Sequence, residues 1–281
     1  MVGPALAAGS ALAAGAGDYV CGTTARRIGT LQCMFAFFTL SLGVAVLWVV
    51  LSGEPAPGSV PIAAGLGAGL ASTVALGAFM RAMVVGTITF VAPISATGVI
   101  VPIVIGTVRG EQPSGIQVVG ILAAIGGVTL AVQSPGDRSG TRHPGTGFGL
   151  AVVSAAGFGL FYWLVAPASR GSVPWAAMLS MAVPVLVCGL VIFVRRASLR
   201  ILLAPGNVRS IVLAAGFGLG GFVLYAFATR HGRLPVVSVL ASLFPVVTIT
   251  LAYTLLGERV HRVQQVGLGA VLAGVILMTL G

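Results

Sequence analysis

Long apolar runs alternate with short polar or helix-breaking separators along all 281 residues of the chain. Each run holds roughly 20 mostly apolar residues, the length that an α-helix needs to cross a bilayer. The separators, rich in Gly, Pro and Arg, are too short to fold as domains. The pattern therefore predicts an all-α integral membrane protein with ten transmembrane helices, at residues 3–22, 30–51, 61–80, 84–108, 115–133, 147–168, 173–194, 210–229, 235–256 and 263–280.

The longest linker without apolar residues, 134–146, lies near the middle of the chain and prompts a search for an internal repeat. Glu111 matches Glu258 at an offset of 147, and this match is informative because the chain has only three glutamates. The same offset gives further matches: Gln117 with Gln264, Gly120 with Gly267, and Gly127 with Gly274. We therefore predict one five-helix repeat over residues 1–133 and a second over residues 147–281.

A second correspondence sets Gly15 and Gly17 against Gly157 and Gly159 at an offset of 142. Since each predicted repeat has an odd number of helices, the second copy enters the membrane upside down. Two inverted repeats are the plan of many secondary transporters, which bind their substrate near the bilayer midplane between the halves.

All fifteen basic residues are arginines, and they are distributed unevenly between the two sets of alternate loops. One set carries eleven and the other carries four, namely Arg109, Arg170, Arg230 and Arg233. The positive-inside rule places the face with eleven arginines in the cytoplasm and both termini outside.

Composition supports a membrane protein, because 57% of the residues are hydrophobic and 7% are charged, against about a quarter charged in soluble domains. The net charge of +10 could suggest nucleic-acid binding. The arginines, however, stand singly or in pairs between apolar runs, where they fix membrane orientation. We expect a small-molecule solute and the lipid bilayer as partners, no nucleic acid, and a multi-pass location in the inner or plasma membrane.

Two stretches in the second half carry a family resemblance: Val237-Ser-Val-Leu-Ala-Ser-Leu-Phe-Pro245, and Leu255-Leu-Gly-Glu258 with the residues up to Gly267. The first half offers Arg81 to Ala96 and Gly110 to Gly120. With these motifs the chain resembles the EamA-like ten-helix branch of the drug/metabolite transporter superfamily. The resemblance implies export of amino acids, other metabolites or drugs, while related branches carry nucleotide sugars. Such proteins are usually drawn with internal termini, whereas the charge count here places them outside.

Asp18 is the one carboxylate well inside a predicted span. A charge in the membrane is costly, so such a residue is a functional candidate by default. If transport is coupled to protons, Asp18 is the residue that would carry them. The alternative is that Asp18 snorkels to the surface and pairs with Arg26 or Arg27.

We predict a central cavity lined by the first, fourth, sixth and ninth helices. Pro93 and Pro245 lie inside the fourth and ninth helices, where each removes a backbone hydrogen bond. They are candidates for gating bends, or alternatively for static kinks. The predicted substrate or coupling residues are Asp18, Tyr19, Pro93, Ser95, Tyr162, Ser242 and Pro245, and Tyr225 is a further candidate for lining the cavity.

Glu111 and Glu258 stand where a helix begins, so we interpret them as structural residues that accept its free N–H groups. Gly120 and Gly127, with Gly267 and Gly274 in the other half, form small faces that let helices pack closely. Those faces predict contact between the last helices of the two halves, or a homodimer surface.

Together these features predict a secondary transporter, most simply an exporter, that moves a small metabolite or drug by alternating access. The alternatives are a carrier for a lipid-linked solute or nucleotide sugar, an intramembrane enzyme, and a membrane scaffold. No grouping of residues indicates catalysis. The sequence offers no cofactor motif, and its three histidines stand apart from the partners that a metal site needs.

Overall fold

The structure, a computed structural model, describes residues 2–85, 91, 94–95, 97–101, 105, 114–132, 144–232, 234–256 and 262–280. Within these ranges the chain forms helices and no strand. The elements are α1 (Val2–Ile28), α2 (Thr30–Ser52), α3 (Ser59–Val85), η1 (Thr97–Val99), α6 (Gly115–Val132), α7 (Pro144–Gly171), α8 (Val173–Arg195), η2 (Arg200–Leu203), α9 (Pro205–His231), α10 (Leu234–Ser242), α11 (Phe244–Leu256) and α12 (Arg262–Leu280).

Five of these helices, α2, α3, α7, α8 and α9, are long and apolar enough to cross a membrane. Helix α1 is equally long, but its many small residues and Asp18 lower its hydropathy. Large apolar side chains cover the outside of the bundle, with Phe193 80% exposed and Leu51 75% exposed. Such a surface suits lipid and not water. The prediction of an all-helical membrane protein is therefore confirmed.

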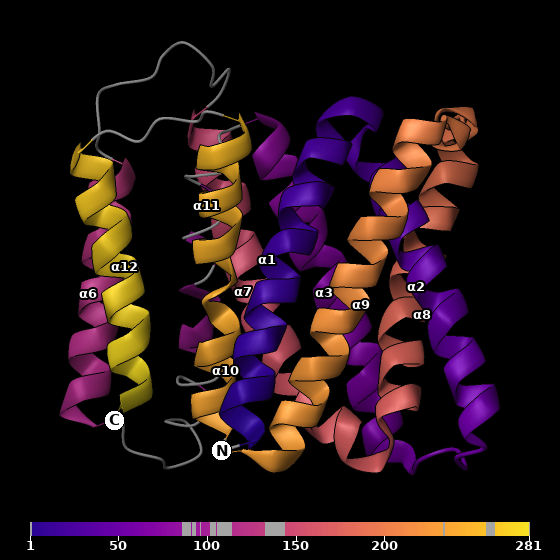
Figure 1. Cartoon of the computed structure of the whole chain (residues 1–281), viewed down its shortest axis with the longest axis horizontal. Coiled ribbons are helices and arrows are strands. Elements are labelled where there is room, and N and C mark those ends of the chain that lie inside the picture. Colours follow the sequence, from indigo (N-terminus) through magenta and orange to yellow (C-terminus); the bar gives the residue numbers. More distant parts are fainter. Residues whose placement is uncertain are drawn as a thin grey trace.

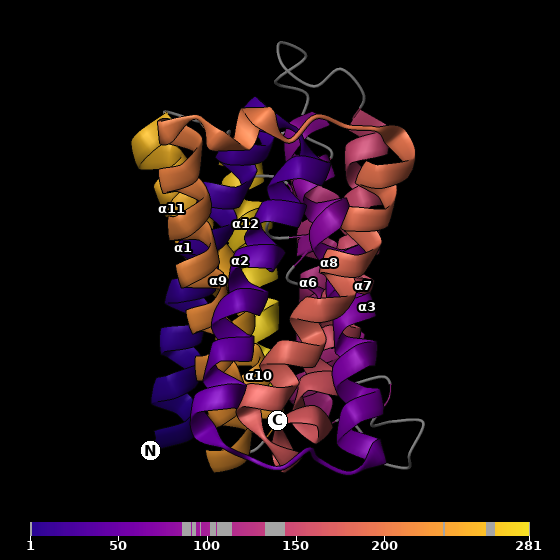
Figure 2. The ribbon, with the colours of Figure 1, turned by 90° about the vertical axis from the view of Figure 1, so that its right-hand side faces the viewer.

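Most of the described helices pack in pairs, and each pair joins a helix of the first half to a helix of the second half (Figures 1 and 2). Helix α1 packs on α9 of the second half, and α7 packs on α3 of the first half. Helix α2 packs on α8, and α6 packs on α12. When the helices of the two halves are matched in chain order, the pair α1 and α9 corresponds to the pair α7 and α3. The pairs of α2 with α8 and of α6 with α12 each correspond to themselves.

Contacts at the helix ends fix the direction in which the helices run. The start of α1, at Gly3, lies against the end of α9 at His231, and Arg27 near the end of α1 bonds to Ser210 near the start of α9. Arg26 also donates to the carbonyl oxygen of Met83, which brings the ends of α1 and α3 together.

The start of α7, at Gly147, approaches the end of α3 at Val85, and the end of α7, at Gly171, meets Pro57 and Pro61. Helix α7 therefore runs opposite to α3. Since α1 and α3 end at the same side of the bundle, α7 also runs opposite to α1. The N and C termini lie at the same end of the molecule (Figure 1).

The burial patterns of α1 and α7 match at an offset of 144, two residues away from the offset of 142 predicted above. At 144 the buried positions coincide along most of both helices. Identical residues at this offset are Gly3 and Gly147, Leu6 and Leu150, Ala7 and Ala151, Ser10 and Ser154, Ala11 and Ala155, Gly15 and Gly159, and Arg26 and Arg170. This register also makes Tyr162 the counterpart of Asp18.

Close approaches at Gly15 and Gly159 follow the same register. A side chain at Gly15 would meet the carbonyl oxygen of Phe244 and the side chain of Val247. A side chain at Gly159 would meet the carbonyl oxygen of Gly98 and the side chain of Val101. The two glycines thus make matching contacts with matching segments of the opposite halves.

The predicted ninth helix is divided into α10 and α11 at Leu243. The Leu243 N–H donates to the Leu240 carbonyl oxygen, and the Val246 N–H donates to the Leu243 carbonyl oxygen. These bonds span three residues where an α-helix would span four. Pro245 lacks an N–H, which explains a local break beside it.

Candidate transport site

Asp18 lies on the inward-facing side of α1. Residues one, two and three turns away on the same line of the helix, Ala7, Ala11, Gly22 and Ala25, are all buried. Asp18 itself is only partly buried. The carboxylate therefore points into the bundle, where charge is costly, and keeps some accessible surface there.

No hydrogen bond or ion pair joins Asp18 to another residue in the described part of the chain. Arg26 donates to the carbonyl oxygen of Met83 at 3.0 Å, and Arg27 donates to Ser210 Oγ at 2.9 Å. The pairing of Asp18 with either arginine, weighed above as the structural alternative, is not formed between these described residues.

A charge on Asp18 would be felt at the phenol of Tyr162, so the two groups lie in the same region of the interior. Tyr162 is 8% exposed, and its hydroxyl has no hydrogen-bond partner among the described residues. Asp18 and Tyr162 thus stand at the same position in the matching burial patterns of α1 and α7. They place one acidic and one phenolic group at the interior face of α1 and α7.

Tyr225 of α9 fixes the position of Tyr162. Its hydroxyl donates to the Tyr162 carbonyl oxygen at 3.0 Å and lies 2.9 Å from Ser238 Oγ on α10. The two tyrosine rings meet edge to face, with centroids 5.0 Å apart. Tyr225 is 1% exposed, so these bonds connect α7, α9 and α10 in the dry interior.

Aromatic rings surround this polar group. Phe161 contacts both Tyr162 and Phe222, with centroid distances of 5.6 and 6.0 Å. A second cluster joins Phe79 of α3, Phe158 of α7 and Phe244 of α11. The interior around Asp18 and Tyr162 is therefore apolar and aromatic, with a few placed polar groups, which is the usual make-up of a small-molecule site.

The other predicted site residues are placed as follows. Tyr19 is partly buried on α1, and Ser242, one turn after Ser238 on α10, is 1% exposed. Ser95 is also 1% exposed, and its buried hydroxyl has no hydrogen-bond partner among the residues that the structure describes. Pro245 lies in the first turn of α11. Pro93 lies outside the described residues.

Glu111 and Glu258, predicted to cap helices, also lie outside the described residues. The glycines predicted to form small faces, Gly120, Gly127, Gly267 and Gly274, are buried in α6 and α12. Those two helices pack against each other.

Metal-ligating side chains do not gather in the described part of the chain, where no group of three or more His, Cys, Asp or Glu could hold an ion. Cys21, Cys33 and Cys188 are buried and free. The thiol of Cys33 lies 3.7 Å from the carbonyl oxygen of Cys21, which fits packing of α2 on α1.

Comparison with solved structures supports the fold over the full length. One crystal structure of a protein superposes with a TM-score of 0.67 and 14% sequence identity, and the match covers 99% of this chain and 96% of that chain. No curated protein sequence matches the chain.

The helical fold and the apolar surface define an integral membrane protein, and the sequence assigns it to the membrane transporters. The model of the EamA-like transporter family matches residues 145–280, nearly the whole second half of the chain. This half of the chain is therefore similar to the EamA-like transporter family, and the match supports membership of the drug/metabolite transporter superfamily.

Proposed function

We propose that the protein is a secondary transporter that exports a small metabolite or drug by alternating access between two inverted five-helix repeats. The observation that carries this proposal is the equivalence of Asp18 and Tyr162. They occupy matching positions in the burial patterns of two helices that run in opposite directions, and both side chains belong to the interior of the bundle. A site between inverted halves is where transporters of this plan bind their solute.

The matching contacts of Gly15 and Gly159 support the inverted repeats in the same way. In such an arrangement the two halves can exchange their conformations, so that the site opens first to one side of the membrane and then to the other. The solute site would lie beside Asp18 and Tyr162, near Ser95 and Ser242.

Asp18 would couple transport to protons. An isolated carboxylate inside a membrane protein is stable only if it is neutral, solvated or paired with a cation. Because no described residue pairs with Asp18, its carboxylate would bind and release a proton. We propose that solute movement is coupled to this binding and release.

The test is transport by the full-length protein in proteoliposomes with an imposed pH gradient. An equimolar mixture of amino acids serves as the first probe, and a trapped pH-sensitive dye reports proton movement. We expect solute-dependent proton flux with the wild-type protein and none with Asp18→Asn. The variant should fold normally, because the amide has nearly the shape of the carboxyl group.

Glu54→Gln is the matched control, because Glu54 is an exposed carboxylate just after α2 and should leave the flux unchanged. Normal pH-driven flux by Asp18→Asn would show that Asp18 has no part in coupling. A nucleotide sugar serves as the second probe. Transport of UDP-glucose in place of amino acids would favour the nucleotide-sugar carrier.

A further inference from the structure

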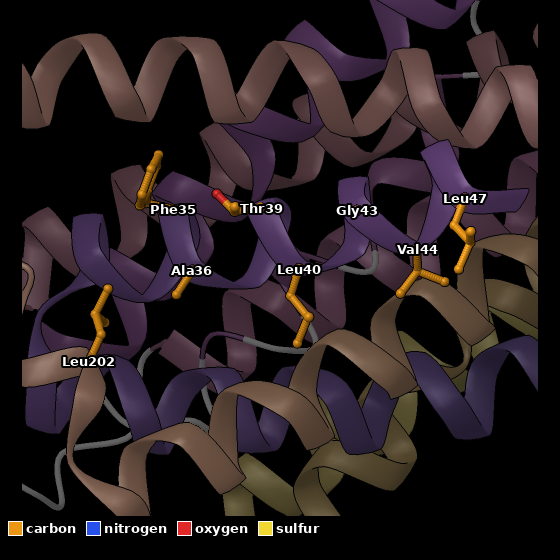
Figure 3. A pocket seen from close by; sticks show the side chains of 8 residues that line it. All are labelled: Phe35, Ala36, Thr39, Leu40, Gly43, Val44, Leu47 and Leu202. Carbon is orange, nitrogen blue, oxygen red and sulfur yellow. The ribbon is translucent and has the colours of Figure 1, made fainter. Parts of the chain in front are cut away.

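A groove of about 470 Å³ runs along the outer face of α2 (Figure 3). Its walls are Phe35, Ala36, Thr39, Leu40, Gly43, Val44, Leu47 and Leu202. Seven of these residues belong to α2, and Leu202 of η2 closes one end of the row, opposite Leu47 (Figure 3). The volume is within the range of roughly 300–1,000 Å³ typical of ligand sites.

The dimensions of the groove fit one acyl chain of a phospholipid. From Ala36 to Leu47 the helix rises by about 16 Å, at about 1.5 Å per residue. This is close to half of the hydrocarbon core of a bilayer, which is about 30 Å thick. The groove therefore spans one leaflet, and Leu202 marks its end nearest the start of α2.

Exposed arginines stand at that end of the groove. Arg200 begins η2, the short helix that carries Leu202, Arg196 lies in the same connection between α8 and α9, and Arg195 and Arg209 lie at the adjoining ends of those two helices. The side-chain amide of Asn207 donates to the carbonyl oxygen of Ile201 at 2.8 Å and holds η2 in place.

The positive charge at this end is not balanced by a described carboxylate. Among the residues that the structure describes, the carboxylates are Asp18, inside α1, and Glu54, at the opposite end of α2. An apolar groove the length of one leaflet thus ends at a basic surface at headgroup level. Basic surfaces in this position bind anionic lipid headgroups.

We propose that this groove is a binding site for an anionic phospholipid, with one acyl chain along α2 and the phosphate beside Arg200. A zwitterionic lipid with the same chains would fill the groove equally well, but its headgroup would gain less from the arginines. The site is independent of the transport cycle proposed above, because it lies on the outer face of α2.

The experiment compares two lipids with identical chains, dioleoylphosphatidylglycerol and dioleoylphosphatidylcholine. The full-length protein in detergent is mixed with equal amounts of both, and bound lipid is counted by native mass spectrometry. We expect one retained phosphatidylglycerol in preference to phosphatidylcholine. The preference should fall by about fivefold in Arg200→Gln, the effect of one arginine near a membrane surface, and should weaken in high salt.

Gly43→Phe tests the groove itself. Gly43 is exposed, and a side chain there meets no atom within 4 Å, so the ring should fill the groove without disturbing the helix. Gly216→Phe on α9 is the matched control, because Gly216 is also exposed with open space around it. We expect loss of the retained lipid in Gly43→Phe only.

Three outcomes would overturn the proposal. The wild-type protein could bind both lipids equally, or Gly43→Phe could retain phosphatidylglycerol as well as Gly216→Phe does. In the third, Gly43→Phe converts a dimer to a monomer without changing lipid binding, which would make the groove an interface between copies. Arg200→Gln keeps the proposal testable if Gly43→Phe fails to fold, because Arg200 is an exposed side chain.

Discussion

At the scale of single residues, the geometry of the candidate site depends on Tyr225. Its hydroxyl contacts the Tyr162 carbonyl oxygen and Ser238 Oγ, so one buried group connects three helices. Tyr225→Phe would remove both hydrogen bonds and leave the Tyr162 carbonyl oxygen and Ser238 Oγ buried without them. Since an unsatisfied buried polar group costs about 1–3 kcal/mol, we expect a loss of stability in that range, measured by chemical unfolding in detergent.

Tyr253→Phe is the control for this substitution, because Tyr253 is 61% exposed on α11 and should tolerate the loss of its hydroxyl. Transport should weaken in Tyr225→Phe, since the Tyr162 backbone loses its anchor. Equal stability of the two variants would contradict the role assigned to Tyr225.

The sequence indicates some of these residues and not others, for physical reasons. Asp18 stands out because a carboxylate in an apolar segment is costly wherever the helix lies. Ser238 does not stand out, because a serine in a membrane helix can satisfy its hydroxyl on its own backbone. Its bond to Tyr225 depends on the packing of α9 on α10, which no local pattern encodes.

At the scale of elements, the helix segments are largely predictable and the register between the halves is not. The ends of α2 and α8 fall within a few residues of the segments 30–51 and 173–194, because charged or helix-breaking residues flank an apolar run. The offset of 142 predicted between α1 and α7 differs by two residues from the offset of 144 at which their buried positions coincide. In a chain with 41 glycines, a Gly-x-Gly pattern recurs by chance, and the burial of Ser10 and Ser154 is what identifies the register.

Pro245 illustrates the same limit. The matching contacts of Gly15 and Gly159 pair Phe244 with Gly98 and Val247 with Val101. This register sets Pro245 against position 99 of the first half. The broken helix at Leu243 is therefore a feature that the first half need not share.

The equivalent glycines give a prediction at this scale. Gly15→Ala and Gly159→Ala would each push a methyl group against a backbone carbonyl of the opposite half. Overpacking of this kind costs about 1–3 kcal/mol, and we expect similar losses of unfolding free energy from both. Gly149→Ala, on the open face of α7, is the control and should be neutral or slightly stabilising. Markedly unequal losses at Gly15 and Gly159 would argue against equivalent contacts.

At the scale of the whole molecule, the distribution of arginines predicts how the protein sits in the membrane. The described helix ends place Arg26, Arg27, Arg195, Arg196, Arg200 and Arg209 on one side of the bundle. Arg170 and Arg230 lie on the other side, where the chain also begins. The positive-inside rule puts the richer side in the cytoplasm, so the proposed lipid site would face the inner leaflet.

A reporter fused after Gly281 tests this orientation. We expect alkaline phosphatase, which works outside the cytoplasm, to be active there, and green fluorescent protein, which fluoresces inside, to be dark. The same reporters inserted after Gly140, in the linker between the predicted repeats, are the internal control. Five predicted spans separate the two points, so the pattern should reverse.

A fluorescent C-terminal fusion with an active phosphatase in the linker would mean that the usual orientation of the family prevails over eleven arginines against four. The same result on both sides of the second half would contradict an odd number of spans in it, and with it the inverted arrangement on which alternating access rests.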